Sequence, residues 1–402
     1  METNDNQILF INGQIPNVDF VNKNSIDLMQ VAAEKLQKAI IDGLKENGQK
    51  VNVVSLPFVG NYPFRFKKMH FPSYSYEEHD FLAFNNLWGY RNISRYNSLK
   101  RFLLDHKNLL NSKRILLYSP HTPFVKIAKI IKKYNPKSHI CLIVPDLPQY
   151  MNLEKHKSIF YRFFKNIDIN ILKKNLRYID SFVLLTKFMS TKINIYNKPE
   201  LIIEGISNSN FKNEFTKTGN VKKKIVYTGK TNKSFGILSL VEAFKLIGNP
   251  NYELHIYGCG DSDSCLKKEV HNNIFFHGFV DSTKINDIIE NADVLVNPRK
   301  NNETYTKYSF PSKLMDYIAT GRPIVCYKLD GIPDEYNEVL FYPKGNTNQD
   351  LADKIVFALN LDEESLIKHF NISKEFIKNK NSFFSIKKLI EFLDRSKDVD
   401  ML

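Results

Sequence analysis

The sequence predicts an α/β fold with two doubly wound parallel sheets, one in each half of the chain. Short apolar runs alternate with helical patterns in both halves, which is typical of parallel sheets covered by helices. The chain has 402 residues and exceeds the size at which one hydrophobic core usually stops growing. A polar stretch rich in Asn and Lys, residues 206–222, interrupts the alternation before it restarts. We therefore expect this stretch to link two domains.

In the first half, strands are expected where short apolar runs end in turn-forming residues. These runs cover residues 8–12, 51–56, 114–118, 139–144, 181–185 and 201–203. Apolar residues at helical spacing predict helices over 25–47 and 124–134, and the first of these ends at Asn47-Gly48, a normal stop signal. The stretch 57–100 is rich in Tyr, Phe and Asn and has weak periodicity, so only a short strand at 81–86 is expected there.

The second half repeats the alternation more regularly. Strands are expected at 224–228, 252–257, 274–276, 294–297 and 324–327, and helices at 234–246, 282–291, 311–319 and 348–359. A further helix is expected near the C-terminus, over 383–393. The order of these elements predicts a second doubly wound sheet.

The formal net charge of +14 indicates an anionic partner, or simply a lysine-rich composition. Part of the excess lies in residues 154–177, where seven Lys or Arg face two acidic residues and alternate with aromatic and aliphatic side chains. Such a basic, aromatic-rich helix suits an anionic membrane surface; the alternative is a solvated helix whose apolar stripe packs in the core. Nucleic acid fits less well, because no basic-aromatic module is evident.

The four cysteines show no paired metal-ligand spacing, so buried thiols in a reducing compartment are expected rather than disulfides or a metal site. The N-terminus lacks a basic segment followed by a long apolar one, and no run reaches the roughly 18 apolar residues of a spanning helix. A cytoplasmic protein is expected, peripheral on the inner face of the plasma membrane if 154–177 binds lipid.

Ligands of open parallel sheets bind beyond the carboxyl ends of the strands, so the loops that follow the strands are the candidate site. Glycines there permit close backbone approach, and cations there can meet phosphate. The candidates from the second half are Gly229, Lys230, Lys233, Gly258, Gly260, Phe279, Val280 and Arg299. We expect Arg299 and Lys230 to bind a diphosphate, and Gly258, Gly260, Phe279 and Val280 to hold a base.

The segment 307–323, KYSFPSKLMDYIATGRP, extends this candidate site. The amides at the start of its helix carry partial positive charge, and a carboxylate on the helix can accept hydrogen bonds from sugar hydroxyls. Its candidates are Tyr308, Ser309, Phe310, Ser312, Lys313 and Asp316. Asp316 is expected past the first turn of the helix and against the ribose. Together the loops predict a site for a nucleotide sugar.

Two polar residues that follow strands of the first half are candidates for catalysis. Asp146 follows the strand at 139–144, and His121 follows the strand at 114–118. A carboxylate there could orient an acceptor hydroxyl or stabilise positive charge on the donor sugar, and a histidine could act as general base. The alternatives are that Asp146 caps a turn and that His121 is structural.

Residues 224–359 resemble the C-terminal half of retaining glycosyltransferase family 4 enzymes. The motifs that carry the resemblance are YTGK, FGILSLVEAF, LHIYGCGD, FFHGFV, ADVLVNPR and SFPSKLMDYIATGRPIV, with IVPDLPQYM and LLTKFM in the first half. The NPR and YSFPSK variant is similar to bacterial transferases that build capsules and exopolysaccharides of the cell envelope.

This resemblance implies a GT-B fold of two Rossmann-like domains. We expect an acceptor-binding domain at 1–205, a nucleotide-sugar-binding domain at 206–385, and a C-terminal helix in 386–402 that crosses back to the first domain. The implied activity is metal-independent, retaining transfer of a hexose from an NDP-sugar, commonly a UDP-sugar, to a lipid-linked or cell-surface glycan.

Two positions depart from the family pattern. Many members have two glutamates eight residues apart, where this chain has Tyr308 and Asp316. The family lysine before the glycine of the first loop is Phe235 here. Two alternatives therefore stay open: a sugar-nucleotide 2-epimerase, and a non-catalytic partner protein with a degenerate site.

Overall fold

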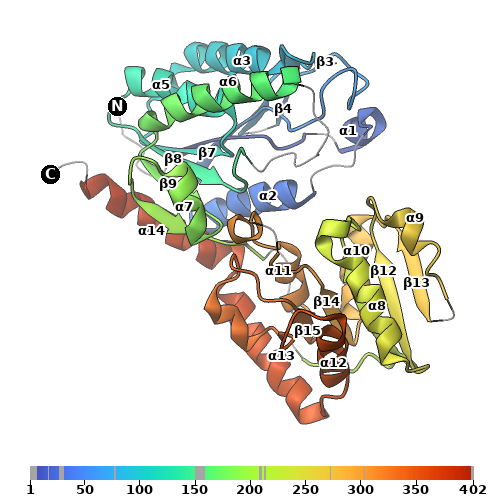
Figure 1. Cartoon of the computed structure of the whole chain (residues 1–402). Helices are drawn as coiled ribbons and strands as arrows, with labels where there is room; N and C mark the ends of the chain where they lie inside the picture. Colours follow the sequence, from blue (N-terminus) through green and yellow to red (C-terminus); the bar gives the residue numbers. More distant parts are fainter. Residues whose placement is uncertain are drawn as a thin grey trace. The chain divides into compact units, whose positions relative to one another are not determined.

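The computed structural model describes residues 7–16, 18–26, 31–76, 78–149, 159–207, 211, 214–271, 273–302 and 304–399. Within these residues the chain forms two compact units (Figure 1). Unit 1 comprises Met1–Glu204 together with Ser382–Leu402, and unit 2 comprises Gly205–Asn381. The C-terminal helix α14 (Ser382–Val399) therefore belongs to unit 1, although unit 2 precedes it in the sequence.

Unit 1 contains an eight-stranded sheet with the order β10-β9-β8-β7-β1-β2-β5-β4. Its strands are β1 (Gln7–Asn12), β2 (Lys50–Ser55), β4 (Tyr74–Tyr76), β5 (His79–Phe81), β7 (Arg114–Tyr118), β8 (His139–Val144), β9 (Ser181–Leu184) and β10 (Glu200–Ile202). All neighbours pair in parallel except β4 and β5. The sheet reverses its direction of growth between β1 and β7, which is where such sheets bind ligands.

Helices cover both faces of this sheet (Figure 1). The helices α3 (Arg91–Asp105), α5 (Thr122–Tyr134) and α6 (Ile159–Asn175) pack side by side on one face, and α2 (Val31–Glu46) packs with α14 on the other. Strand β8 is buried along its whole length, as expected for a parallel strand between two helical layers. The remaining short elements are α1 (Val18–Asn24), β3 (His70–Phe71), β6 (Phe84–Asn85), α4 (Lys107–Leu110) and α7 (Ser190–Ile193).

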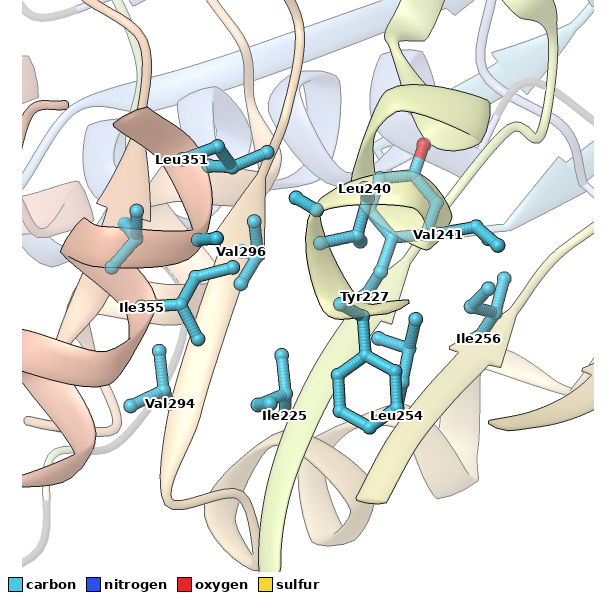
Figure 2. Close-up of a cluster of buried hydrophobic side chains, with 14 of the residues drawn as sticks. Ile225, Tyr227, Leu240, Val241, Leu254, Ile256, Val294, Val296, Leu351 and Ile355 are labelled. Atoms are coloured by element: carbon cyan, nitrogen blue, oxygen red, sulfur yellow. The ribbon is translucent and has the colours of Figure 1, made fainter. Parts of the chain in front are cut away.

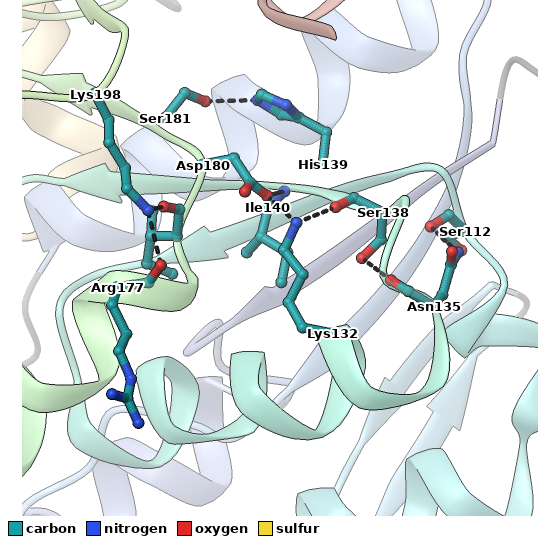
Figure 3. Close-up of polar contacts among 11 residues, drawn as sticks. Ser112, Lys132, Asn135, Ser138, His139, Ile140, Arg177, Asp180, Ser181 and Lys198 are labelled. Atoms are coloured by element: carbon teal, nitrogen blue, oxygen red, sulfur yellow. Dashed lines mark hydrogen bonds and ion pairs between the residues drawn. The ribbon is translucent and has the colours of Figure 1, made fainter. Parts of the chain in front are cut away.

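A half-buried carboxylate, that of Asp180, connects the start of β8 with the start of β9 (Figure 3). Asp180 accepts a hydrogen bond from the Ile140 amide at 2.7 Å and pairs with Lys132 Nζ at 2.7 Å. The same ammonium donates to the Ser138 carbonyl, also at 2.7 Å. His139 and Ser181 form a second buried link, with 2.8 Å between Nε2 and Oγ. These contacts join the starts of β8 and β9.

Unit 2 contains a five-stranded parallel sheet with the order β13-β12-β11-β14-β15. Its strands are β11 (Lys223–Thr228), β12 (Tyr252–Tyr257), β13 (Ile274–Gly278), β14 (Val294–Asn297) and β15 (Ile324–Cys326), and its helices are α8 (Ile237–Ile247), α9 (Asp263–Leu266), α10 (Ser282–Glu290), α11 (Lys313–Ile318), α12 (Asn348–Leu359) and α13 (Glu363–Lys378). This is the Rossmann order, which reverses between β11 and β14.

The core of unit 2 lies between this sheet and the helices α8 and α12 (Figure 2). Leu240 and Val241 of α8 meet Tyr227 and Ile256 of the strands, and Ile355 of α12 lies over the other half of the sheet. All five side chains are at most 1% exposed. Burial on this scale makes the strands rigid, so the loops at their ends are held in place.

Several predicted elements differ from the structure. The helix expected over 25–47 is wrong at its start: α1 ends at Asn24, and the Ile26 amide bonds to the Arg65 carbonyl at 3.0 Å. The strand expected at 81–86 is divided between β5 and β6. Helices α3 and α13 were not predicted, and the helix expected over 311–319 is confined to Lys313–Ile318.

Candidate active site

The candidate site of unit 2 is built on close packing between the loops that follow β11 and β12. Gly229 has φ 130° and Gly258 has φ 142°, conformations that side chains rarely adopt. A Cβ atom at Gly258 would overlap the Gly229 carbonyl. The Gly258 amide donates to the Gly278 carbonyl at 2.7 Å, which brings the end of β13 to the same place. Glycine is therefore required at Gly258 by contact as well as by conformation.

Lys313 brings a buried amine to the Gly229 loop. Its Nζ lies 2.8 Å from the position that a Cβ of Gly229 would take, and 4.0 Å from the centre of the Tyr227 ring. Among the residues that the structure describes, this buried Nζ has no hydrogen-bond partner. Burial, followed by repulsion from Arg299, lowers the pKa of Lys313 to about 7. The amine is thus placed for an anion that the protein itself does not supply.

Arg299 is the second cation of the site and follows β14, on the other side of the reversal in strand order. It is only 6% exposed. Its guanidinium lies over two aromatic rings, 5.4 Å from the centre of Phe235 and 5.0 Å from that of Tyr305. These cation–π contacts orient a planar group that can bind phosphate oxygens in pairs.

Two tyrosines hold the β11 loop in position. The Tyr317 hydroxyl accepts a hydrogen bond from the Thr228 amide at 2.9 Å and lies 3.1 Å from the Thr228 hydroxyl. The Tyr227 hydroxyl donates to the Lys230 carbonyl at 2.5 Å. Both rings are fully buried. Neither tyrosine was a sequence candidate, because a buried aromatic residue gives no signal that distinguishes a supporting role from core packing.

The loop after β11 also packs against the turn after β12. The Thr231 amide donates to the Cys259 carbonyl at 3.1 Å, and the Gly260 amide donates to Asp263 Oδ1 at 2.9 Å. Lys230 and Lys233 are both exposed, and the Lys233 amide donates to Asp261 at 2.8 Å. The structure thus places Lys230 and Gly260 beside Gly229 and Gly258, with the lysine side chains in solvent.

The segment 306–316 is mostly buried beside these loops. Tyr308 and Phe310 are each 7% exposed, and the Ser309 hydroxyl is buried without a hydrogen-bond partner in the described part of the chain. Ser312 is exposed and precedes α11. Asp316 is half-buried and lies in the first turn of α11, so its expected place past that turn is wrong. Because α11 has six residues, its dipole adds less positive charge than the longer predicted helix.

Phe279 and Val280 follow β13 at the edge of the sheet. Phe279 is 58% exposed, so it does not belong to the core. Val280 is half-buried. An exposed ring next to Gly258 and Gly278 is available to stack on a planar base.

In unit 1, His121 lies beside the reversal in strand order between β1 and β7. Its ring makes edge contacts with Phe58 and Phe124, at 5.6 Å and 5.2 Å between ring centres. Its Nδ1 is buried and has no hydrogen-bond partner within the described residues. Burial, with repulsion from Arg95 and Arg91, keeps the pKa of His121 well below its usual value, so the ring is neutral near pH 7. A neutral imidazole can accept a proton or donate a hydrogen bond.

Asp146 is exposed in the loop after β8. Its charge, together with that of Glu34, contributes to a raised pKa of the buried Tyr118, although burial is the larger cause. Burial also raises the pKa of Glu34 to about 7, while a hydrogen bond from the Ile15 amide at 3.2 Å opposes the shift. Glu34 and Tyr118 were not sequence candidates. Their proximity depends on how α2 crosses the ends of β1 and β7.

The basic segment 154–177 is only partly described. Residues 154–158 and the side chains of 159–164 lie outside the described residues. In the remainder of α6, Lys173 and Lys174 are exposed, Leu172 is buried, and Ile167 and Ile171 are 40% and 36% exposed. No described helix is both long and apolar enough to cross a membrane, and no group of three or more potential metal ligands occurs in the described parts of the chain.

The segment that carries this geometry matches a known protein family. Residues 222–360 match the family model described as glycosyl transferases group 1. This match spans β11 to α12 and contains the glycine loops, Arg299 and Lys313. A search of curated protein sequences found no significant match.

Solved structures are similar over nearly the whole chain. Sucrose-phosphate synthase from Thermosynechococcus elongatus is 12% identical, with a TM-score of 0.64 and coverage of 98% of this chain and 99% of the other. An α,α-trehalose 6-phosphate synthase from Burkholderia multivorans is 8% identical, with a TM-score of 0.63 and the same coverage. Anabaena HepE, solved in complex with UDP, is 11% identical, with a TM-score of 0.62 and coverage of 97% and 100%. At these identities the likeness shows the fold, which is GT-B.

Proposed function

We propose that this GT-B glycosyltransferase uses a UDP-sugar and transfers its hexose, with retention, to a lipid-linked or cell-surface glycan in polysaccharide biosynthesis. The observation that carries the proposal is the pair of cations at the strand ends of unit 2. Lys313 holds a buried amine against Gly229 that has no hydrogen-bond partner within the described residues, and Arg299, from the end of β14, lies over Phe235 of the same loop. Both lie inside the segment that matches glycosyl transferases group 1.

The chemistry requires positive charge at this place. When the bond to the sugar breaks, the leaving nucleoside diphosphate gains negative charge, and fixed cations aimed at it lower the barrier. In our proposal Arg299 binds phosphate oxygens in pairs and Lys313 contributes a point charge. Lys230 and Lys233, both exposed, add positive charge at the entrance.

The family pattern places a lysine at position 235, and in our proposal a cation that follows another strand takes its place. Position 235 is a phenylalanine, and the Arg299 guanidinium lies over its ring. We infer that Arg299 takes the role of the missing lysine. Asp316, half-buried on α11, is proposed to accept hydrogen bonds from the ribose hydroxyls, with Gly258, Gly260, Phe279 and Val280 around the base.

Unit 1 is proposed to bind the acceptor. His121 is a neutral ring with a buried, unpartnered Nδ1 within the described residues, and Asp146 is an exposed carboxylate at the neighbouring strand end. Either group can orient an acceptor hydroxyl. The acceptor is proposed to be carried by lipid, with the basic segment 154–177 at the inner face of the plasma membrane. Two of its lysines, Lys173 and Lys174, are exposed.

A donor screen read by mass spectrometry tests the proposal. Purified protein is incubated with each of several nucleoside diphosphate sugars, with and without membrane extract, and free nucleoside diphosphate is measured. We expect one UDP-sugar to release UDP, and the release to fall at least about tenfold in Lys313→Met. Lys267→Met removes an exposed lysine of the same unit and is the matched control. Epimerised sugar nucleotide without transfer, or no reaction with any donor, would contradict the proposal.

A further inference from the structure

Unit 1 has a set of large apolar side chains that lie outside its core and are exposed to solvent. They lie on the loop that leads to β3 and on the segment from β6 into α3, and we call them the loop patch. Its members and their exposed fractions are Phe64 66%, Met69 51%, Leu87 40%, Trp88 48%, Tyr90 42% and Ile93 55%. Scattered single residues of this kind are normal, but a contiguous set usually marks an interaction surface.

Backbone hydrogen bonds hold the two segments of the loop patch together. The Trp88 amide donates to the Tyr62 carbonyl at 3.0 Å, and the Tyr62 amide donates to the Asn86 carbonyl at 2.9 Å. The Asn86 amide donates to the Met69 carbonyl at 2.6 Å, next to the pairing of β3 with β6. The backbone segments that carry these exposed side chains are therefore held next to each other.

The two segments that carry the loop patch are basic, although Glu78 and Asp80 lie on the hairpin between them and Asp168 of α6 lies near Arg91. Residues 57–76 and 81–104 contain no Asp or Glu, whereas they contain three and four Lys or Arg residues, respectively. Lys67 and Lys68 are exposed between Phe64 and Met69. Each basic residue near an anionic membrane strengthens binding by electrostatic attraction, and neighbouring apolar side chains add to it by entering the bilayer.

The chemistry of the loop patch favours lipid over other partners. Trp88 and Tyr90 are of the residue types that prefer the boundary between water and acyl chains. Aromatic and basic residues also suit single-stranded nucleic acid, but Met69, Leu87 and Ile93 offer no ring for base stacking. A symmetric contact with a second copy would bring Lys67 and Lys68 close to their own equivalents without a carboxylate from these segments.

We propose that the loop patch inserts into the interfacial region of an anionic phospholipid bilayer. This inference rests on the proposed function only in taking the acceptor to be carried by lipid. It adds the loop patch as a second membrane contact beside the basic segment 154–177. Phe64, Trp88 and their neighbours then bring unit 1 to the bilayer from which the acceptor comes.

The chain provides its own probe, because Trp88 is its single tryptophan. The full chain is mixed with vesicles of phosphatidylcholine containing phosphatidylglycerol, and with vesicles of phosphatidylcholine alone. We expect the emission of Trp88 to shift to the blue with anionic vesicles, and lipids brominated on the acyl chain to quench it. Both effects should weaken with added salt, because the attraction of the lysines is screened.

Matched variants test whether the loop patch, and not another exposed surface, binds the vesicles. The double variant K67E/K68E should lower vesicle binding at least about tenfold, whereas K267E/K268E, which reverses two exposed lysines of unit 2, should not. Phe64→Ser should also lower binding, and Phe357→Ser, which alters a side chain exposed to 51%, should not. All six positions are exposed, so thermal melting should be unchanged in the four variants, and this is measured first.

Each other outcome overturns the inference. Vesicle binding without quenching of Trp88, lost instead in K173E/K174E, would assign the contact to α6. A blue shift that depends on protein concentration without lipid would indicate a second copy, and a shift with oligonucleotides alone would indicate nucleic acid. Release of UDP from the donor in solution, measured on the same samples, reports the proposed activity separately, so that failure of one does not imply failure of the other.

Discussion

Replacing Lys313 with methionine tests the electrostatics of the candidate site most directly. The pKa of Lys313 is lowered to about 7, from an ordinary 10.5, so the amine is half-protonated near neutral pH in the free protein. A bound diphosphate favours the protonated form and raises this pKa. By linkage, affinity for UDP must fall as the pH rises through 7. If the pKa exceeds 9 in the complex, the Kd rises about 20- to 25-fold between pH 6.5 and 8.5.

Calorimetric titration with UDP over this pH range measures the effect. The terminal phosphate of UDP itself titrates near pH 6, so the Lys313→Met variant is the reference that contains this contribution alone. We expect the ratio of the two Kd values, variant to wild type, to be large at pH 6.5 and to shrink toward pH 8.5. A ratio that does not change with pH would refute the reasoning.

The same substitution has a predicted effect on stability, with a defined sign. The pKa of Lys313 is lower in the folded than in the unfolded chain, so its charge opposes folding fully below pH 7, and the penalty disappears as the pH rises to 10.5. A shift of this size corresponds to roughly 5 kcal/mol at most. Lys313→Met should therefore raise the melting temperature at pH 6.5, and the gain should diminish toward pH 10. A gain that is equal at both pH values would contradict this assignment.

Three further changes test neighbouring features. Arg299→Lys keeps the charge but loses the planar fork, so affinity for UDP should fall about tenfold to a hundredfold by calorimetry; unchanged affinity would remove Arg299 from the site. Tyr317→Phe deletes the acceptor of the Thr228 amide and should lower the free energy of unfolding in urea by about 1–3 kcal/mol; no loss would mean that water replaces the hydroxyl. Glu34→Gln should stabilise the protein at pH 8 by up to about 3 kcal/mol and have no effect at pH 4, because the pKa of Glu34 is raised to about 7 and only its ionised form opposes folding. Thermal melting at pH 8 and at pH 4 measures this difference in stability. An equal effect at the two pH values would be inconsistent with the raised pKa.

The sheet of unit 2 was predictable because its strands are apolar runs, or alternate apolar with polar residues as β12 does, and have glycine or proline near their ends. The strands β12 and β14 have the predicted bounds, 252–257 and 294–297. Such runs are buried on at least one face, and a glycine such as Gly258 follows directly where the next loop leaves no room for a side chain. Local sequence and long-range packing agree there.

The stretch 57–100 was not predictable for the opposite reason. Helix α3 buries only Arg95, Leu99 and Leu103, and its other positions are mostly Asn, Ser, Tyr and basic residues, so the helical period is weak. The strands β3 and β6 are two residues long and exist through pairing between residues 13 or more apart, such as His70 with Asn85. Contacts between residues far apart in the chain determine this structure, and such contacts cannot be predicted from the local pattern of a single sequence.

For the candidate site, the sequence indicated which residues lie close together, but it did not indicate which charged groups are buried or how their pKa values shift. Gly229, Arg299 and Lys313 are far apart in the chain, and strand order alone predicts that they meet. That the Lys313 amine is buried and unpartnered among the described residues depends on the contact with Gly229 and on the Tyr227 ring. These contacts arise only from the three-dimensional packing of unit 2.

The state of Lys313 also argues for function, since it is unfavourable in the free protein. Burial and repulsion from Arg299 both act against its charge, and these are the causes of its lowered pKa. The ring of Tyr227 attracts the amine, but a cation–π contact contributes about 0.5–2 kcal/mol, less than the roughly 5 kcal/mol penalty. An amine that only packed against the core would be more stable as methionine. A dianionic ligand at Gly229 would turn the same repulsion between Lys313 and Arg299 into a shared attraction, which is the arrangement that a diphosphate requires.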